Sequence, residues 1–167
     1  AHVSPTGTFG GVDFRPGSLP VVALVTEQSW RDPAVGTGYS FPAPTMVDLK
    51  KAFADANAKF VALNNSLTTS LTDPQSNDLS DATKSNIPPG AFAGACGAGQ
   101  CCTGLSGAGR APGGPGGACR MVFLHSNGTK LSDQLVSAIK ALSLGSTFAV
   151  TAAVSYIFFR FLLRKRI

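Results

Sequence analysis

Four cysteines are the residues of this 167-residue chain whose type and spacing most directly offer chemistry. They are Cys96, Cys101, Cys102 and Cys119, and in an oxidising compartment they allow two disulfides in three connectivities. Cys101 and Cys102 are poor partners for one another, because the planar peptide between them resists so tight a ring. We therefore expect each of them to bond to Cys96 or to Cys119.

Metal binding and free thiols are the other interpretations of these cysteines. The spacing Cys96-x4-Cys101 is similar to that of plant-type iron–sulfur proteins, but that pattern requires two residues between its second and third cysteines. Structural zinc is unsupported because the chain has no C-x2-C pair and His125 is the only histidine nearby. The sequence thus favours disulfides over free thiols, and free thiols over metal.

Acid–base or nucleophilic catalysis requires a histidine and a carboxylate that converge. The chain has one glutamate, Glu27, and two histidines, His2 and His125, and no such set is visible. His125 is a candidate ligand for a pigment or haem at a membrane interface, although an ordinary turn histidine is the favoured interpretation. We therefore predict that the chain is not an enzyme and has no metal site or intrinsic cofactor.

The net charge of +5 does not indicate nucleic-acid binding. Fourteen basic residues oppose nine acidic ones, but four of the fourteen stand together near the carboxyl terminus, at Arg160, Arg164, Lys165 and Arg166. The rest of the chain is nearly neutral, and such a terminal cluster is typical of the flank of a membrane span. We expect neither nucleic acid nor a small-molecule substrate as a partner.

The sequence predicts that the structural elements of the chain are separate segments joined by connectors. Residues 1–44 contain six prolines and six glycines, which predicts an extended arm with one strand candidate at Pro20 to Gln28. Aromatic residues of this arm, such as Trp30, are candidate anchors for the surface of another protein, or members of a small local cluster.

Residues 45–72 predict an amphipathic helix. Thr45 is the expected N-cap, with Asp48 at the capping-box position. Large apolar or small residues then recur at spacings of three and four, which would form a packing stripe of Leu49, Phe53, Ala56, Phe60, Leu63 and Leu67. One such stripe cannot bury itself, so it needs a partner.

The segment KAFADANAKFVALNNSL, Lys51 to Leu67, resembles the amino-terminal lumenal helix of the plastocyanin-docking subunit of photosystem I. The resemblance consists of the Lys-Ala-Phe-Ala start and the later Ala-Leu-Asn. The chain lacks that helix's run of lysines and the cysteine upstream of it. We therefore carry over no donor-docking role and do not assign the family.

Residues 73–118 predict a connector, first polar and then rich in Gly, Pro and Cys, with 15 Gly or Pro among residues 88–118. Ordering so many glycines costs backbone entropy, so disulfides or neighbouring subunits are expected to fix the segment. Residues 119–130 predict a short strand at Met121 to Leu124 and a turn at Asn127-Gly128.

Residues 131–167 predict a transmembrane helix with a basic tail. Ala141 to Phe159 is a run of nineteen residues without a formal charge, and it extends to Leu163 if Arg160 reaches the headgroups. Small residues four apart would form a helix-packing face of Ala141, Gly145, Ala149 and Ala153. The basic residues would anchor the carboxyl terminus on the stromal or matrix side.

These features predict a mainly α chain with long irregular regions: one amphipathic soluble helix and one C-terminal transmembrane helix, joined by a Gly/Pro-rich connector, without a compact globular core. The expected function is that of a non-catalytic, single-pass accessory subunit of a large energy-transducing membrane complex, photosystem-type first and respiratory-type second. Its amino-terminal region would lie on the lumenal or intermembrane side, in the thylakoid rather than the mitochondrial inner membrane. Membrane lipids and other subunits would be its partners, with peripheral chlorophyll, carotenoid or lipid contacts. The alternatives are a type I membrane receptor or adhesion protein with a disulfide-linked ectodomain, and a membrane-bound thiol redox protein.

Overall fold

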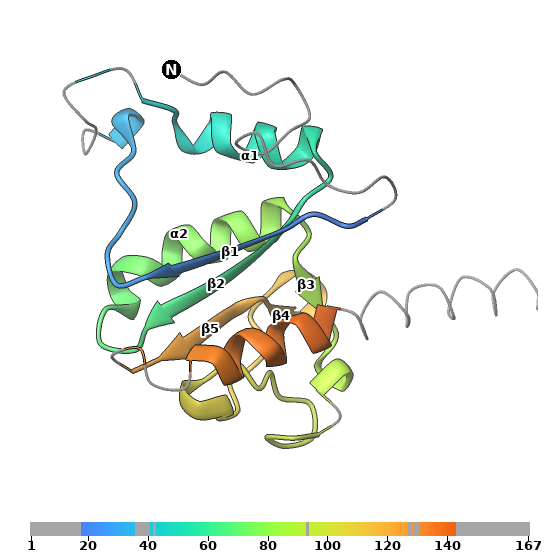
Figure 1. Ribbon diagram of the computed structural model, residues 1–167. Helices are drawn as coiled ribbons and strands as arrows, with labels where there is room; N and C mark the ends of the chain where they lie inside the picture. Colours follow the sequence, from blue (N-terminus) through green and yellow to red (C-terminus); the bar gives the residue numbers. More distant parts are fainter. Residues whose placement is uncertain are drawn as a thin grey trace, which may run out of the picture.

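A three-stranded parallel sheet lies at the centre of the part of the chain that the computed structural model describes, namely residues 18–35, 41, 43–92, 94–126, 128 and 131–142. Its strands, in spatial order, are β1 (Val21–Thr26), β2 (Lys59–Asn65) and β5 (Val122–His125). Val21 pairs with Lys59 at one end, and Asn65 pairs with His125 at the other. All three strands therefore point their carboxyl ends to one edge (Figure 1).

Helices cover both faces of this sheet. Two of them, α1 (Met46–Asp55) and α2 (Thr69–Ala82), pack on one face, and a third, described over residues 131–142, packs on the other (Figure 1). Short 3₁₀ turns are found at Pro33–Val35, Pro89–Phe92, Leu105–Gly107 and Pro115–Gly117. The predicted fold class is thus wrong: these residues form a compact α/β unit around a parallel sheet.

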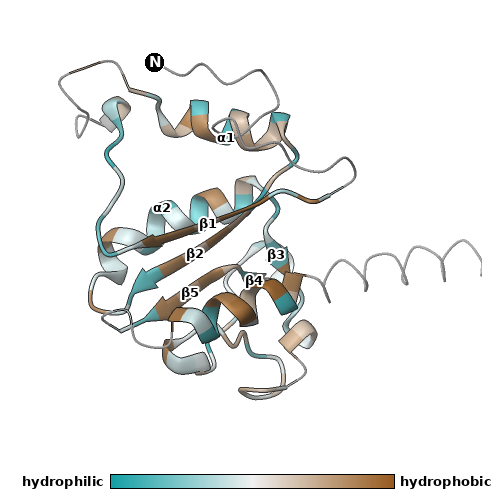
Figure 2. Ribbon diagram, viewed as in Figure 1, coloured by the Kyte–Doolittle hydropathy of each residue, from teal (hydrophilic) through white to brown (hydrophobic). Residues whose placement is uncertain are grey.

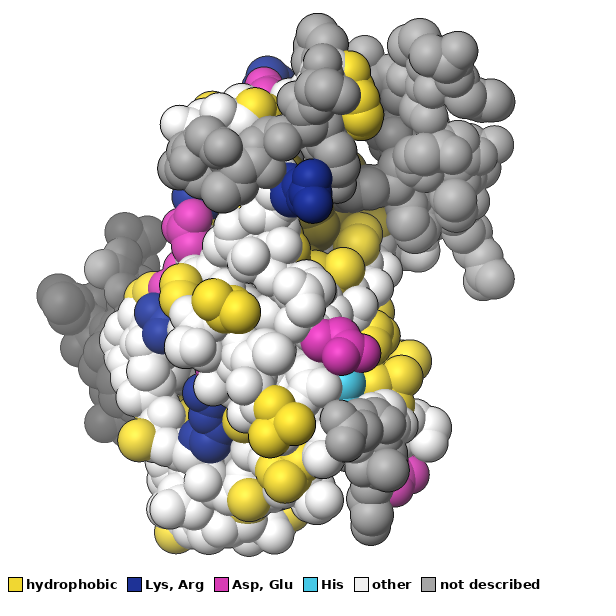
Figure 3. Space-filling model, turned by 90° about the vertical axis from the view of Figure 1, so that its left-hand side faces the viewer, with side chains coloured by type: hydrophobic (Ala, Val, Ile, Leu, Met, Phe, Trp, Pro, Cys, Tyr) yellow, Lys and Arg dark blue, Asp and Glu magenta, His cyan; other side chains and the backbone are white. Residues whose placement is uncertain are grey.

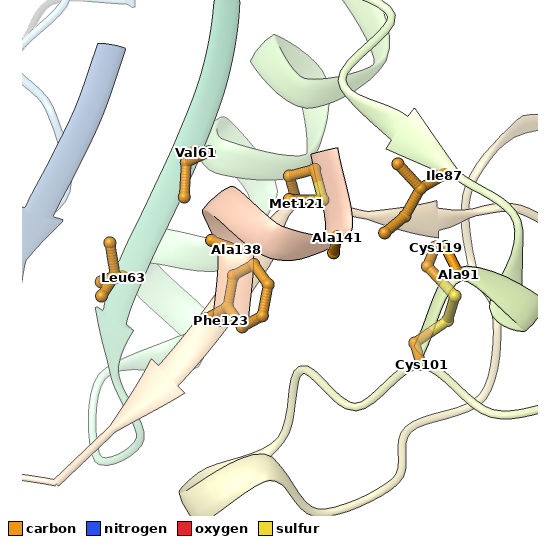
Figure 4. Packing of buried hydrophobic residues seen from close by; sticks show 10 residues of the cluster. All are labelled: Val61, Leu63, Ile87, Ala91, Cys101, Cys119, Met121, Phe123, Ala138 and Ala141. Atoms are coloured by element: carbon orange, nitrogen blue, oxygen red, sulfur yellow. A yellow bond between two sulfur atoms is a disulfide. The ribbon is translucent and has the colours of Figure 1, made fainter. Parts of the chain in front are cut away.

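Successive side chains of β2 point to opposite faces of the sheet, so the strand contributes to two hydrophobic cores, one on each face. Phe60 and Ala62 face α1 and α2, whereas Val61 and Leu63 face the third helix. Because both faces are covered, most of β2 is apolar, as expected for a buried parallel strand, and Figure 2 shows it brown up to its polar end. Figure 4 follows the second core from Leu63 to the cysteine pair at its far side.

The predicted helix over residues 45–72 is correct only at its start. Thr45 accepts a hydrogen bond from the Asp48 amide, and Asp48 accepts one from the Thr45 amide at 2.8 Å, which confirms the capping box. The helix ends at Asp55 because Asn57 adopts a left-handed φ of 47°. The amide of Ala58 then donates to the Phe53 carbonyl at 2.9 Å, which closes the helix end in a Schellman motif.

The second helix, α2, has little apolar periodicity in its sequence. Its buried residues are mostly polar: Thr72, Asp73, Ser76, Leu79 and Ser80. It also contains Pro74, which belongs to the segment predicted as a polar connector. Its burial depends on hydrogen bonds to the neighbouring strand and loop rather than on an apolar stripe.

Residues 88–118 form a lobe closed by a small antiparallel pair, β3 (Asn86–Ile87) and β4 (Cys119–Arg120). Disulfides join Cys96 to Cys102 and Cys101 to Cys119, so all four predicted disulfide cysteines are paired. The expected disulfides are thus present, and they hold this glycine-rich segment from within the chain.

The described part of the predicted membrane span belongs to the folded core. Ala141 is 2% exposed and packs in the cluster that contains Phe123 and Ala138 (Figure 4). Among the residues that the structure describes, no helix has the length and hydrophobicity needed to cross a bilayer. Residues 143–167 lie outside the described residues, and with them Gly145, Ala149 and Ala153 of the packing face and the anchor residues Arg160, Arg164, Lys165 and Arg166.

Candidate functional site

The carboxyl edge of the sheet is the place where a parallel α/β fold most often binds its ligands. The strands end there in Thr26, in Asn64-Asn65 and in His125, and Figure 2 shows the tips of β2 and β5 in the polar colour. The buried strand β2 contributes two amide side chains that are 0% and 2% exposed. The hydrogen bonds of the buried polar groups at this edge therefore determine which of them could contact a ligand.

The first group is a hydrogen-bonded network around Asn64. Asn64 Nδ2 donates to Asp73 Oδ1 at 2.8 Å and to Ser76 Oγ at 3.2 Å, and Ser76 Oγ donates to Asn64 Oδ1 at 3.3 Å. Arg110 Nη2 donates to the second oxygen of Asp73 at 3.0 Å. Both carboxylate oxygens of Asp73 are thus occupied, and the network fastens β2, α2 and the lobe together.

The second group surrounds Asn65 and His125, which are paired in register. Asn65 Oδ1 accepts the Leu67 amide at 3.0 Å, and the His125 carbonyl accepts the Ser66 amide at 2.8 Å. His125 Nδ1 accepts the Gly128 amide at 3.2 Å, which assigns the imidazole proton to Nε2. These bonds fix the loop that follows β2 and the turn that follows β5.

Two buried atoms of this region have no hydrogen-bond partner in the described part of the chain: His125 Nε2 and Gln134 Oε1. Both side chains are 3% exposed, and Gln134 Nε2 donates to the Gly104 carbonyl at 3.3 Å. A buried atom at the end of β5 and another on the third helix thus lack protein partners among the described residues, and a bound water can satisfy such groups.

A pigment-ligating role for His125 requires a free nitrogen lone pair. In this arrangement Nδ1 accepts a backbone amide and Nε2 is buried with the proton, so neither nitrogen offers a lone pair to a metal. Pigment ligation by His125 stays a prediction, and it requires a hydrogen-bonding arrangement of the imidazole ring that differs from the one described. No cluster of three or more His, Cys, Asp or Glu suited to a metal ion occurs among the described residues.

Hydrophobic side chains are exposed at the same edge. Leu67, in the loop after β2, is 76% exposed; Leu71, in the first turns of α2, is 53% exposed; and Val25, near the end of β1, is 51% exposed. Figure 3 looks onto this edge and shows hydrophobic groups separated by neutral polar surface. The edge therefore offers apolar contact points beside Asn64, Asp73 and Asn65, whose side chains are hydrogen-bonded within the chain.

The predicted packing stripe is divided among different environments. Leu49 and Phe53 of α1 and Phe60 of β2 pack in one core, Leu63 packs in the core on the other face, and Leu67 is exposed. The cysteines lie at the lobe, where Cys101 is 3%, Cys102 7% and Cys119 0% exposed. The stripe and the cysteines therefore serve the fold and do not converge on the carboxyl edge.

Sequence reasoning missed the network of Asn64, Asp73, Ser76 and Arg110. Asn64 lies inside a run with helical spacing, and Asp73 and Ser76 lie in a segment without apolar periodicity. Asn57 and the β-branched and aromatic residues that follow it were the available signals for a break and a strand. Arg110 stands 37 residues from Asp73, and nothing local connects them.

The lobe is also tied to α2 by a second ion pair. Arg120 Nη2 and Nε donate to Asp81 in a bidentate arrangement, with the shortest distance 2.7 Å. The hydrogen bonds to Asp81 raise the pKa of Arg120 above its ordinary value. The guanidinium is therefore a permanent structural cation beside the Asn86 amide, which donates to the same carboxylate at 3.2 Å.

Comparisons with known proteins do not assign the chain to a family. The chain matches no protein-family model, and neither the curated proteins nor the solved structures contain a significant match.

Proposed function

We propose that the chain is a non-catalytic binding domain of the receptor or adhesion class, which folds in an oxidising compartment and presents the carboxyl edge of its sheet to a protein partner. The observation that carries this proposal is the pairing of all four cysteines within one folded unit. Disulfides of this kind form and persist in secretory, lumenal or periplasmic space.

The chemistry of the edge favours binding over reaction. Asp73 is engaged by Asn64 and Arg110, and His125 uses Nδ1 to accept a backbone amide. These groups hold loops in place and leave no nucleophile with an adjacent base among them. Loops held in place by a fixed scaffold commonly carry binding residues, and Leu67 in the loop after β2 and Leu71 in the first turns of α2 add exposed apolar surface close to one another in sequence.

Site-specific photocrosslinking tests the proposed surface. A benzophenone amino acid at position 71 is expected to crosslink one protein partner in the native compartment. The matched control is the same amino acid at position 139, because Leu71 and Ile139 are 53% and 54% exposed on different faces. Mass spectrometry of the adduct identifies the partner, and equal crosslinking from both positions contradicts the assignment of the edge.

Non-reducing mass spectrometry tests the proposed compartment. Protein from its native source, blocked with an alkylating reagent before lysis, is expected to contain Cys96 linked to Cys102 and Cys101 linked to Cys119. Four alkylated cysteines in that material contradict an oxidising location. Glycan analysis at Asn127 adds to this test, whereas Asn64 of the other sequon is 0% exposed and is not expected to carry a glycan.

A second candidate is the accessory subunit of an energy-transducing membrane complex, photosystem-type first and respiratory-type second. The exposure of Leu67 and Val25 favours it, because permanent complexes cover such side chains. Location in the thylakoid membrane, with chlorophyll, carotenoid or lipid contacts, belongs to this candidate and depends on residues outside the described ranges. Native gels of mild-detergent membranes distinguish the two: comigration with subunits of such a complex supports the second, and a monomer supports the first.

The thiol redox alternative has less support. Exchange requires an accessible sulfur, and Cys101, Cys102 and Cys119 are all buried. Only Cys96 is partly exposed. Incubation with a glutathione buffer, followed by alkylation, is the measurement that decides whether the Cys96–Cys102 bond exchanges while the protein stays folded.

A further inference from the structure

A polar pocket of about 70 Å³ lies between the middle of α2, the start of β5 and the disulfide lobe with its closing strand β4. Arg110 and Thr103 of the lobe line it, together with Arg120 of β4 and Asn77 of α2. None of the described residues that line it is acidic. The pocket therefore has two cationic side chains in its wall and no carboxylate.

One face of α2 positions the two guanidinium groups. Asp73, Asn77 and Asp81 follow one another at intervals of four residues, so they share a face of the helix. Asp73 accepts a hydrogen bond from Arg110 at 3.0 Å, and Asp81 accepts one from Arg120 at 2.7 Å. The carboxylates thus fix both arginines, and the Asn77 amide stands between them on the pocket wall.

The Cys101–Cys119 disulfide also fixes the backbone that carries both arginines. Cys101 and Arg110 exchange backbone hydrogen bonds at 2.9 and 2.8 Å, and Arg120 directly follows Cys119 in β4. A covalent link and two ion pairs therefore set the spacing of the guanidinium groups before any ligand binds. Such preorganisation lowers the entropic cost of binding.

Several donors of this pocket have no acceptor in the described part of the chain. Arg110 uses only Nη2, and Arg120 uses Nε and Nη2, which leaves Nε and Nη1 of the first and Nη1 of the second. Arg120 Nη1 lies beside Gly113, another lining residue, because a β-carbon at position 113 would come within 3.3 Å of it. A group rich in acceptors would satisfy these donors together.

The Thr103 hydroxyl is a further polar group without a hydrogen-bond partner among the described residues, although Thr103 is only 3% exposed. Buried polar groups are nearly always paired, so a lone hydroxyl in the wall of a pocket requires an explanation. A ligand oxygen in the pocket supplies the missing partner.

We propose that this pocket binds a phosphate group, free or as a monoester, whose oxygens accept hydrogen bonds from Arg110, Arg120, Asn77 and Thr103. A guanidinium has N–H donors and no acceptor, and its planar fork matches the oxygens of phosphate. The four side chains come from different places in α2, β4 and the lobe, which suits a tetrahedral group better than a planar carboxylate.

The volume of the pocket agrees with a group of this size. An apolar cavity of about 150 Å³ in another protein holds benzene, so about half that volume has room for about five heavy atoms. The inference does not depend on the function proposed above, because the pocket lies at Val122, the first residue of β5, and not at the carboxyl end of that strand.

Nuclear magnetic resonance of the full chain tests the pocket with inorganic phosphate and methyl phosphate, at constant ionic strength with chloride as the balancing ion. The Nε–H resonances of Arg110 and Arg120 are expected to shift saturably, with a dissociation constant of about 1 mM, because both cations are already paired with carboxylates. Acetate has fewer acceptor sites and is expected to bind about fivefold more weakly. Stronger binding of methyl phosphate assigns the site to a monoester, and stronger binding of inorganic phosphate assigns it to the free ion.

Two substitutions place the binding in this pocket. Asn77→Asp adds a carboxylate to the wall at a half-buried position, and affinity for phosphate is expected to fall about tenfold. Thr103→Val keeps the shape of the side chain and removes one hydrogen bond to a charged group, with a loss of about tenfold, whereas Thr103→Ser is expected to retain binding. Asn57→Asp, the same exchange at an exposed position after α1, is the matched control and is expected to leave binding unchanged.

Three results overturn the proposal. The first is a pair of arginine resonances that neither phosphate probe shifts saturably at tens of millimolar while the amide spectrum shows a folded protein. The second is unchanged phosphate affinity in folded Asn77→Asp and Thr103→Val variants. The third is equal affinity for acetate and phosphate, since the pocket then does not select a tetrahedral group.

Discussion

Arg110 joins the disulfide lobe to α2 by donating from Nη2 to Asp73 Oδ2 at 3.0 Å. The carboxylate is the more buried partner: the Asp73 side chain is 13% exposed and that of Arg110 is 37% exposed. The same Arg110 forms a backbone bridge with Cys101, at 2.9 and 2.8 Å. One residue therefore connects the disulfide-bonded loop to the buried polar network at the end of β2.

Arg110→Met is expected to lower the free energy of unfolding by about 1–2 kcal/mol. The substitution keeps the apolar stem but leaves the buried Asp73 carboxylate with fewer donors, and the exposure of Arg110 keeps the effect below that of a fully buried pair. Urea denaturation at pH 7, followed by circular dichroism, measures it. Lys51→Met is the control, with an expected loss below about 0.5 kcal/mol, because Lys51 and Asp55 are 72% and 43% exposed. Equal losses in both variants would contradict a special role for Arg110.

Removing the two disulfides is expected to have unequal effects. Cys101 and Cys119 are 18 residues apart, and their replacement by alanine should cost about 3 kcal/mol. Cys96 and Cys102 are 6 residues apart, and the same change should cost about 2 kcal/mol. Thermal unfolding of the oxidised variants without reductant measures the order. A larger loss from the Cys96–Cys102 pair would mean that loop length does not set the relative contributions of the two disulfides.

Several elements were predictable from the sequence because their signals are local. The strand candidate at Pro20 to Gln28 contains β1, the candidate at Met121 to Leu124 overlaps β5, and Thr45 with Asp48 starts α1. Each depends on residues within one turn or one short run. The compact fold was missed because the apolar spacing from Leu49 to Leu67 continues without a break while the backbone changes from helix to strand at Asn57.

The candidate site was less predictable than the fold. The polar residues that build it, Asn64, Asp73 and Arg110, come from β2, α2 and the lobe, which only the tertiary fold brings near one another. Their burial follows from tertiary contacts, and composition gave no sign of it. The pairing of cysteines was easier to expect, because two adjacent cysteines exclude one connectivity on covalent geometry alone.

The stability of α1 is expected to depend on pH through Asp48. Hydrogen bonds from the Thr45 backbone amide and then from its hydroxyl lower the pKa of Asp48 below 3.8. A carboxyl whose pKa is lower in the folded state stabilises the fold above its unfolded pKa, and this contribution is lost as the pH falls through the folded value. Asp48→Asn should therefore lower the urea midpoint at pH 7, and the difference from the natural chain should shrink below about pH 4.

Urea titrations at pH 7, 5, 3 and 2 measure this dependence. Asp55→Asn, at the other end of α1, is the matched control, because it removes one carboxylate without touching the capping box. A difference between Asp48→Asn and the natural chain that stays constant from pH 7 to pH 2 would exclude the carboxylate charge as its source.

The sheet itself is tested by Phe60 and Leu67, which share one face in a helix over residues 45–72 but not in the fold described here. Phe60 is 2% exposed, and its ring centre lies 5.7 Å from that of Trp30 and 5.9 Å from that of Phe53. Phe60→Ala is expected to lower the free energy of unfolding by about 3–5 kcal/mol. Leu67→Ala, at a site 76% exposed, is expected to change it by less than about 0.5 kcal/mol.

Urea denaturation and near-ultraviolet circular dichroism measure both variants, and Phe60→Leu, with an expected loss below about 1.5 kcal/mol, serves if the alanine variant does not fold. The spectrum adds a second readout, because the single tryptophan contacts Phe60 and its signal should change only in the variants at position 60. Similar losses at both positions would mean that the two side chains share one environment, as a continuous helix requires and as strand β2 forbids.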